Sequence, residues 1–167
     1  MTEHETAVRN VIAAAGGRLV GKTRLQKTAY ILKIAGLSPD FSYTYHYYGP
    51  YSEEVATATK DAILDDLIAE TESVAQWGGT FSVFTTSYNG DVDEKSREIV
   101  AVACSSDSVT LELAATAAFL KVSGVQDWWG ETARRKPQKA TPERMDLAKA
   151  LWDRLREIGT PVPLPAL

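Results

Sequence analysis

The chain has 167 residues, and 44% of them are apolar, which is enough to bury one sizeable core. Charged residues make up 24% of the chain, with 11 glycines and 7 prolines, which excludes a disordered, collagen-like or low-complexity sequence. Lys and Arg number 18 against 22 Asp and Glu, and the net charge of −4 argues, as a total, against a nucleic-acid partner.

The residues that mark compartments and metal sites are few. A single cysteine, Cys104, excludes a disulfide framework and favours a reducing compartment. Charged residues precede the first apolar ones, unlike in a signal peptide, and no uncharged run is long enough to span a bilayer. His4 and His46 have no partner at metal-ligand spacing. We therefore expect a cytoplasmic protein with no membrane segment, metal or cofactor.

Helical periodicity predicts a short helix over residues 6–15, which Gly16-Gly17 ends. A second helix is predicted from Thr23, as its N-cap, to Ala35. Gly36 ends this helix, and Pro39 prevents it from resuming.

Aromatic residues alternate with small or polar ones over residues 41–48, which predicts a half-buried strand. Gly49-Pro50 ends that strand. Ser52 is then the expected N-cap of a third helix that runs to about Glu70, with two glutamates well placed in its first turn.

The next region has the character of β-structure. Gly79–Tyr88 and Glu98–Cys104 are the two predicted strands, and they flank Asn89-Gly90-Asp91. Asn-Gly is a strong hairpin signal, although this connection is longer than a tight two-residue turn.

The C-terminal third is predicted to be helical. Val109–Val122 has one apolar stripe, and 127–140 is an interrupted polar stretch. Thr141 and Pro142 are the expected N-cap and first residue of a last helix that extends to Ile158, before a proline-containing extended tail.

Gly16 to Thr23 satisfies the phosphate-loop pattern of Gly, four residues, Gly, Lys and Thr. In such a site Gly16, Gly21, Lys22 and Thr23 would bind the phosphates and magnesium of a nucleotide. The context disfavours this, because residues 6–15 have helical rather than strand periodicity and no alternating β-α units follow. The alternative is a helix-ending glycine pair, a turn and a basic helix.

The charges are unevenly placed. Residues 6–39 contain six basic residues and no acidic one, whereas an acidic segment follows around 53–72. Lys22, Arg24 and Lys27 on the predicted second helix would suit phosphates or an acidic protein partner. The alternative is that this basic helix packs against the acidic one within the fold.

Aromatic residues gather in two places. Tyrosines crowd 43–51, and Tyr48 and Tyr51 would either pack at the edge of the core or face a partner. Trp128-Trp129 precede a basic run that includes Lys136 and Lys139, which suits either base stacking or anchoring of a loop to the core.

Two segments together resemble a known family. The run Arg18-Leu19-Val20-Gly21-Lys22-Thr23-Arg24-Leu25-Gln26-Lys27 with Tyr30, followed by Tyr48-Gly49-Pro50-Tyr51-Ser52 before an acidic helix, resembles YwgA-type proteins. More distantly it is similar to Panacea and SocA-like antitoxin domains, over about residues 8–70. The resemblance implies a winged-helix-like α+β unit and an interaction module, because the related antitoxin domains act by binding proteins. It also accounts for Gly21-Lys22-Thr23 without a nucleotide.

The expected fold is α+β and predominantly helical, in one domain over 1–167. It has a winged-helix-like part (1–72), a small antiparallel β part (73–107), a helical part (108–160) and a tail (161–167). We expect a non-enzymatic regulatory or protein-interaction module, antitoxin-like in one version, with no catalytic residues. A DNA-binding winged helix and a nucleotide-binding protein stay as alternatives, and the sequence does not fix the partner or the oligomeric state. The candidate contact residues are Lys22, Arg24, Lys27, Tyr48 and Tyr51.

Overall fold

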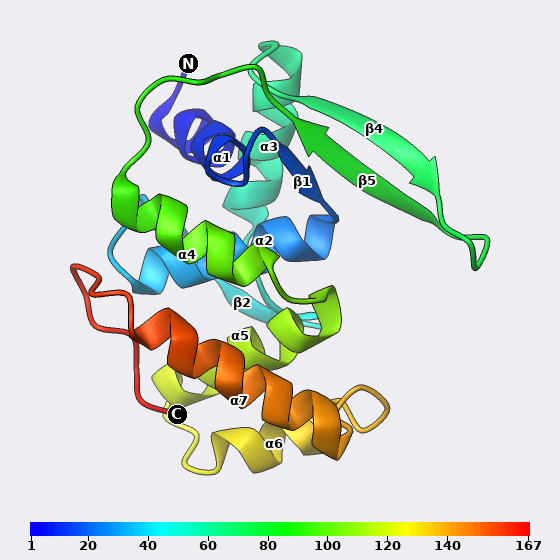
Figure 1. The fold of residues 1–167 in the computed structure, drawn as a ribbon, viewed down its shortest axis with the longest axis vertical. Coiled ribbons are helices and arrows are strands. Elements are labelled where there is room, and N and C mark those ends of the chain that lie inside the picture. The colour runs from blue at the N-terminus through cyan, green and yellow to red at the C-terminus, as the bar shows by residue number, and fades with distance from the viewer.

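Seven helices and five short strands make up the fold, in a computed structural model that describes all of residues 1–167 (Figure 1). In chain order they are α1 (Glu3–Ala14), β1 (Arg18–Val20), α2 (Lys22–Ile34), β2 (Thr44–His46), β3 (Gly49–Tyr51), α3 (Glu53–Leu64), β4 (Ala69–Val74), β5 (Thr80–Thr85), α4 (Glu94–Cys104), α5 (Ser108–Val122), α6 (Trp128–Arg135) and α7 (Pro142–Arg156). The expectation of a mainly helical α+β fold with small antiparallel sheets is confirmed.

The strands form two separate antiparallel sheets. One has the order β1-β5-β4, with Leu19 opposite Phe84 and Thr71 opposite Val83. Its β4–β5 hairpin extends away from the helices (Figure 1). The other sheet is the small hairpin β2–β3, which lies among the helices near α5.

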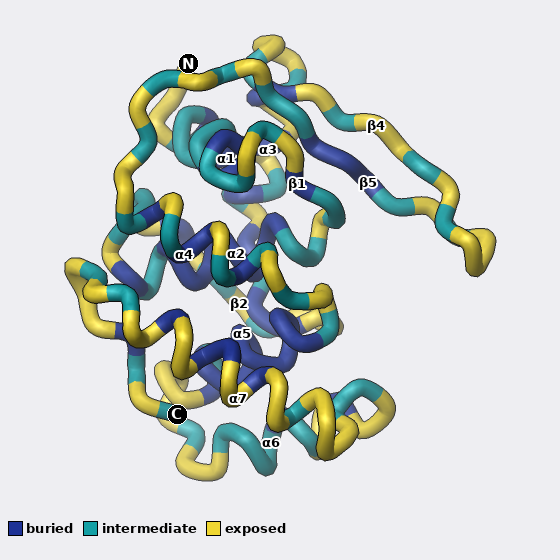
Figure 2. The backbone as a smooth tube through the Cα atoms, in the orientation of Figure 1, coloured by how far each residue is buried: buried dark blue, intermediate teal, exposed yellow.

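One hydrophobic core of 29 buried residues runs through the molecule, with contributions from every helix except α6. Helix α5 lies at its centre and is buried almost all round (Figure 2). A helix that is apolar on all faces belongs in a core, and α5 carries a single charged residue, Glu112, before its last turn. The C-terminal tail returns to this core, where Leu164 is buried and the Trp152 indole N–H donates to the Pro165 carbonyl at 2.7 Å.

Helices α3 and α7 start where the sequence predicts them, whereas α1 starts at Glu3 rather than at residue 6, behind a capping box formed by Thr2 and Glu5. The Ser52 hydroxyl accepts a hydrogen bond from the Val55 N–H at the start of α3, and the Thr141 hydroxyl accepts one from Arg144 ahead of Pro142 in α7. Side chains that accept from the first-turn N–H groups satisfy donors that the helix leaves unpaired. The expected helix over 109–122 is also present as α5.

The predicted strand at Glu98–Cys104 is wrong, because these residues form most of α4. The Asp93 carboxylate accepts a hydrogen bond from the Ser96 N–H and starts that helix, whose buried face includes Ile99 and Ala103. A short apolar run does not by itself distinguish a buried strand from a buried helix. Asn89-Gly90-Asp91 therefore forms no hairpin, and β5 pairs with β4 instead.

Several predicted boundaries also move. The helix after Ser52 ends at Leu64 rather than Glu70, and Glu70 lies in β4. The strand expected over 41–48 is limited to Thr44–His46. Gly21, not Thr23, is the N-cap of α2, and no side chain caps that helix.

Candidate functional site

The most distinctive surface is the hairpin β2–β3, residues 44–51, which we call the aromatic hairpin. Tyr45 lies opposite Pro50 and His46 opposite Gly49, so Tyr47 and Tyr48 form the two-residue turn. Tyr47 is 80% exposed and Tyr48 is 51% exposed. Gly49 has φ +95°, a conformation that side chains with a Cβ rarely adopt.

Helix α2 holds one side of this hairpin through two buried side chains. The Gln26 amide forms two hydrogen bonds with the Ser52 backbone, one to its carbonyl (3.0 Å) and one from its N–H (2.9 Å). The Lys27 ammonium donates to the Pro50 carbonyl at 2.9 Å, and only 1% of this residue is exposed. The Leu-Gln-Lys segment and the Tyr-Gly-Pro turn are thus two halves of one structural unit.

The loop after α6 holds the other side. The Lys136 ammonium donates to the Tyr47 carbonyl at 2.9 Å and pairs with a Glu112 carboxylate oxygen at 2.9 Å. Lys139 reaches both oxygens of the same carboxylate at 3.0 Å. We call Lys27, Lys136, Lys139 and Glu112 the lysine cluster.

Burial and charge shift the ionisation of Lys27. Loss of hydration lowers its pKa to about 8, Glu112 opposes this shift, and the ammonium groups of Lys136 and Lys139 add to it. The cluster therefore combines several cations with one carboxylate in a largely dehydrated place.

Cations also lie over the aromatic rings of the hairpin. Lys139 lies 4.6 Å from the centre of the Tyr48 ring, and Arg135 lies 4.7 Å from that of Tyr45. On the opposite edge His46 and Tyr51 stack at 4.5 Å. These contacts fix the rings in place and give the surface a positive rim.

Three hollows adjoin the aromatic hairpin. A pocket of about 590 Å³ lies between Tyr45, Tyr47 and the segment 135–139, and one of about 360 Å³ lies against Tyr48 and Tyr51. A third, of about 670 Å³, runs from Tyr48 along the start of α2 to the β4–β5 hairpin.

The five contact residues expected from the sequence differ in how far the structure exposes them. Tyr48 is exposed and Lys22 has 72% of its side chain exposed, and both line the third hollow together with Arg24. Tyr51 is half-buried beside His46. The prediction that Lys27 lies on an exposed basic face is wrong, because this residue is buried.

The basic helix α2 is not a free cationic face: it packs against the acidic helix α3, as the alternative interpretation expected, although no ion pair joins the two helices. The Arg24 guanidinium donates to the carbonyls of Val20 and Ser106, and Lys22 approaches Glu70 of β4 at 3.8 Å. The remaining ion pair of this helix joins Lys33 to Asp40. Most of its charge therefore serves contacts within the fold.

The nucleotide interpretation of Gly16, Gly21, Lys22 and Thr23 is also corrected. Arg18–Val20 form a strand against β5, and the Gly21 N–H donates to the Ser82 carbonyl at 2.8 Å. A phosphate cradle needs a loop whose N–H groups converge on the ligand. Here the loop is replaced by a strand that follows a helix.

Sequence reasoning missed the roles of Gln26 and Glu112. Glu112 carried a signal, since it is the one charged residue between Val109 and Leu120, and an isolated charge in an apolar helix needs a partner. Lys136 and Lys139 face the hairpin rather than the tryptophans, which lie under Lys121 and Lys149.

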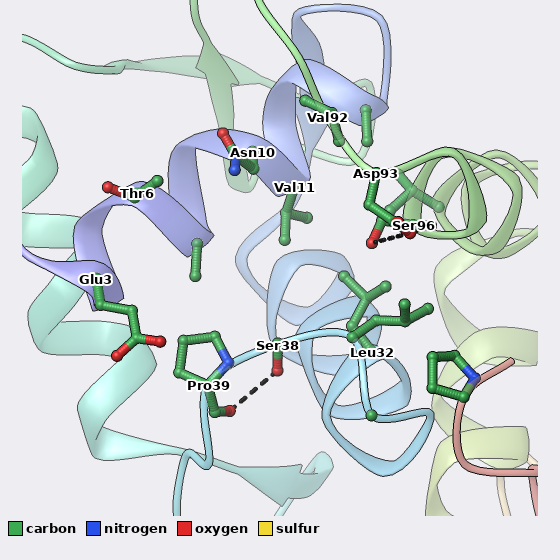
Figure 3. Close-up of a pocket in the computed structure, with 16 residues that line it drawn as sticks. Glu3, Thr6, Asn10, Val11, Leu32, Ser38, Pro39, Val92, Asp93 and Ser96 are labelled. Atoms are coloured by element: carbon green, nitrogen blue, oxygen red, sulfur yellow. Dashed lines mark hydrogen bonds between the residues drawn. The ribbon is translucent and has the colours of Figure 1, made fainter.

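A further pocket of about 580 Å³ lies between α1, the residues after α2 and the start of α4 (Figure 3). Glu3, Asn10 and Ser38 are among its polar residues, and Val11 and Leu32 among its apolar ones. It contains no Lys, Arg, His or Cys, and the Asp93 carboxylate at its edge is used to cap α4. The Ser96 hydroxyl in the same pocket donates to that carboxylate at 3.4 Å.

No family model, curated protein or solved structure matches this chain. No group of three His, Cys, Asp or Glu side chains is close enough together to hold a metal ion. None of the helices is both long enough and apolar enough to cross a membrane.

Proposed function

We propose that this protein is a non-enzymatic, cytoplasmic protein-interaction module that binds an acidic protein partner through the aromatic hairpin. The observation that carries the proposal is that Tyr47 and Tyr48 are exposed on a backbone that buried Lys27, Lys136 and Gln26 hold in place.

The construction of the hairpin supports a binding role. Burying an ammonium group costs free energy, and an exposed two-residue turn needs no such support for its own folding. Rigid tyrosines with a basic rim are typical of the residues that dominate protein interfaces, because they add contact area at little cost in conformational entropy. The cations beside the rings, Lys139 and Arg135, favour an acidic partner.

We also infer that residues 3–85 form a winged-helix unit, as the resemblance to YwgA-type and antitoxin domains implies. The order helix, strand, helix, helix, strand, strand and the sheet order β1-β5-β4 support this, with the aromatic hairpin inserted before α3. The β4–β5 hairpin would be the wing.

The charge of α3 weighs against the DNA-binding alternative. In a helix-turn-helix unit the second helix enters the major groove, and here that helix would be α3. It carries Glu53, Glu54 and Asp61 against a single Lys60. Phosphates would repel such a helix, so we favour a protein over DNA as the partner.

Site-specific photo-crosslinking in cells tests the proposal. A benzophenone amino acid replaces Tyr47, and the matched control places it at Leu64, which is 79% exposed at the end of α3. We expect one predominant protein adduct from position 47 and none from position 64. Equal crosslinking at both positions, or none at position 47, would contradict the proposal, and crosslinking to nucleic acid would favour the DNA-binding alternative.

A further inference from the structure

The pocket between the aromatic hairpin and the loop after α6 has the composition of an anion site. Its volume of about 590 Å³ lies within the range of small-molecule sites. Three cations and two tyrosines dominate its wall, and no carboxylate lines it; the lining residues are Tyr45, Tyr47, Arg135, Lys136, Pro137, Gln138 and Lys139.

The buried charge behind this wall is not balanced. Lys136 and Lys139 share the single carboxylate of Glu112, and the side chains of Lys136 and Glu112 are each only 3% exposed. Lys27 lies in the same cluster and bonds to a neutral carbonyl. Arg135 adds a further cation, which Glu131 offsets. Three buried or half-buried ammonium groups thus have one counter-charge, and a bound anion would supply another.

The ammonium groups also keep hydrogen-bond donors without a protein acceptor. Each lysine ammonium has three N–H donors. Lys136 uses them on the Tyr47 carbonyl and Glu112, and Lys139 on the two oxygens of Glu112. At least one N–H of each lysine therefore has no protein acceptor, and Lys139, whose side chain is 28% exposed, and Gln138 both line the pocket.

The tyrosines give the pocket an apolar side. Arg135 lies over the Tyr45 ring, and Lys139 lies 5.7 Å from the centre of the Tyr47 ring. A ligand whose charged group meets the cations would therefore place its carbon skeleton against these rings.

We propose that this pocket binds a small organic oxyanion, a phosphate ester or a carboxylate with an attached ring. The inference goes beyond the protein-interaction function and does not depend on it. Lys136 contacts the Tyr47 carbonyl, so a ligand held by Lys136 adjoins the turn of the hairpin directly.

Isothermal titration calorimetry on the full chain tests the site, at constant ionic strength, with phenyl phosphate, benzoate and inorganic phosphate as probes. Phenyl phosphate and benzoate distinguish a phosphate group from a carboxylate, and inorganic phosphate reports the charge without the ring. We expect one site per chain, with the ring-bearing probe of the preferred group binding more tightly than inorganic phosphate.

Two variants locate the binding. Lys139→Gln and Arg135→Gln should each weaken it by about tenfold, because each removes a charged hydrogen-bond donor. Lys149→Gln on α7 makes the same change of charge outside the pocket and should leave the affinity unchanged. Circular dichroism and thermal unfolding without ligand establish that each variant is folded. The proposal is overturned if no probe binds at millimolar concentration, or if the pocket variants bind as tightly as the unchanged protein.

Discussion

Gln26 and Ser52 are joined by two hydrogen bonds, so that a side-chain amide on α2 pairs with the backbone of a residue 26 positions later as a neighbouring strand would. Ser52 in turn caps α3. This pairing connects the second helix, the end of the aromatic hairpin and the third helix at one buried point.

Replacing Gln26 with Ala should lower the free energy of unfolding by roughly 2–4 kcal/mol, since two buried backbone groups of Ser52 lose their partners. Urea unfolding measures this loss. Gln76→Ala, in the exposed loop between β4 and β5, is the control and should change stability by less than about 0.5 kcal/mol. Equal effects of the two substitutions would show that the Gln26 pairing contributes little.

Lys27 should give the protein a pH-dependent stability. Its pKa is about 8 in the folded protein against 10.5 in the unfolded chain, so between these values the unfolded chain binds the extra proton and stability rises with pH. The loss of stability that comes from burying the charged Lys27 is complete below pH 8, and it disappears as the pH approaches 10.5.

Because other groups titrate in the same window, the measurement compares the protein with Lys27→Met. Between pH 8 and pH 10.5 the unfolding free energy of the unchanged protein should rise by about 3 kcal/mol relative to that of the Lys27→Met variant. Burial is the main cause of the lowered pKa of Lys27; Glu112 opposes the shift, and Lys136 and Lys139 add to it. A difference that stays constant with pH would mean that Lys27 keeps its ordinary pKa.

Gly49 should tolerate no side chain. A Cβ there would lie 2.5 Å from the buried Thr116 hydroxyl oxygen, in addition to the strain of φ +95°. Gly49→Ala should therefore cost about 3 kcal/mol or more, whereas Gly78→Ala, at φ +90° with open space around it, should cost about 1 kcal/mol.

Thr116→Ala separates the clash from the strain. Combined with Gly49→Ala it should restore part of the lost stability, because the oxygen that blocks the Cβ is gone. If the two substitutions are additive in thermal unfolding, the steric explanation is wrong.

Glu112 should be needed for folding stability. Glu112→Gln leaves the ammonium groups of Lys136 and Lys139 without a counter-charge and should cost about 3 kcal/mol or more. Glu131→Gln removes a carboxylate from two largely exposed arginine pairs and should cost less than about 1 kcal/mol. Chemical denaturation at neutral pH compares them, and similar losses for both would contradict the role given to Glu112.

Elements with a short-range signal are predictable here, and those that depend on long-range pairing are not. Thr141-Pro142 and Ser52 mark helix starts because a cap acts within three residues. Glu98–Cys104 has no such clear signal inside its apolar run, and its helical form depends on Asp93 upstream and on packing against the core. Likewise Gly79–Tyr88 is recognisable as a strand, but its partner is β4 rather than the residues after Asn89-Gly90.

The sequence by itself determined the mainly helical class and the helix caps at Ser52 and Thr141. Only the tertiary structure decided that Lys27 is buried and that Glu112 forms ion pairs with two lysines. It also decided that Lys136 donates to the Tyr47 carbonyl, 89 residues earlier in the chain. The reason is that a charge pattern along the chain reports which residues are cationic, whereas hydration depends on what the rest of the chain places over them. The basic segment that the sequence suggested as a surface is therefore partly buried, and its Lys27 holds the aromatic hairpin from inside. The proposed anion site lies at Lys136 and Lys139 instead.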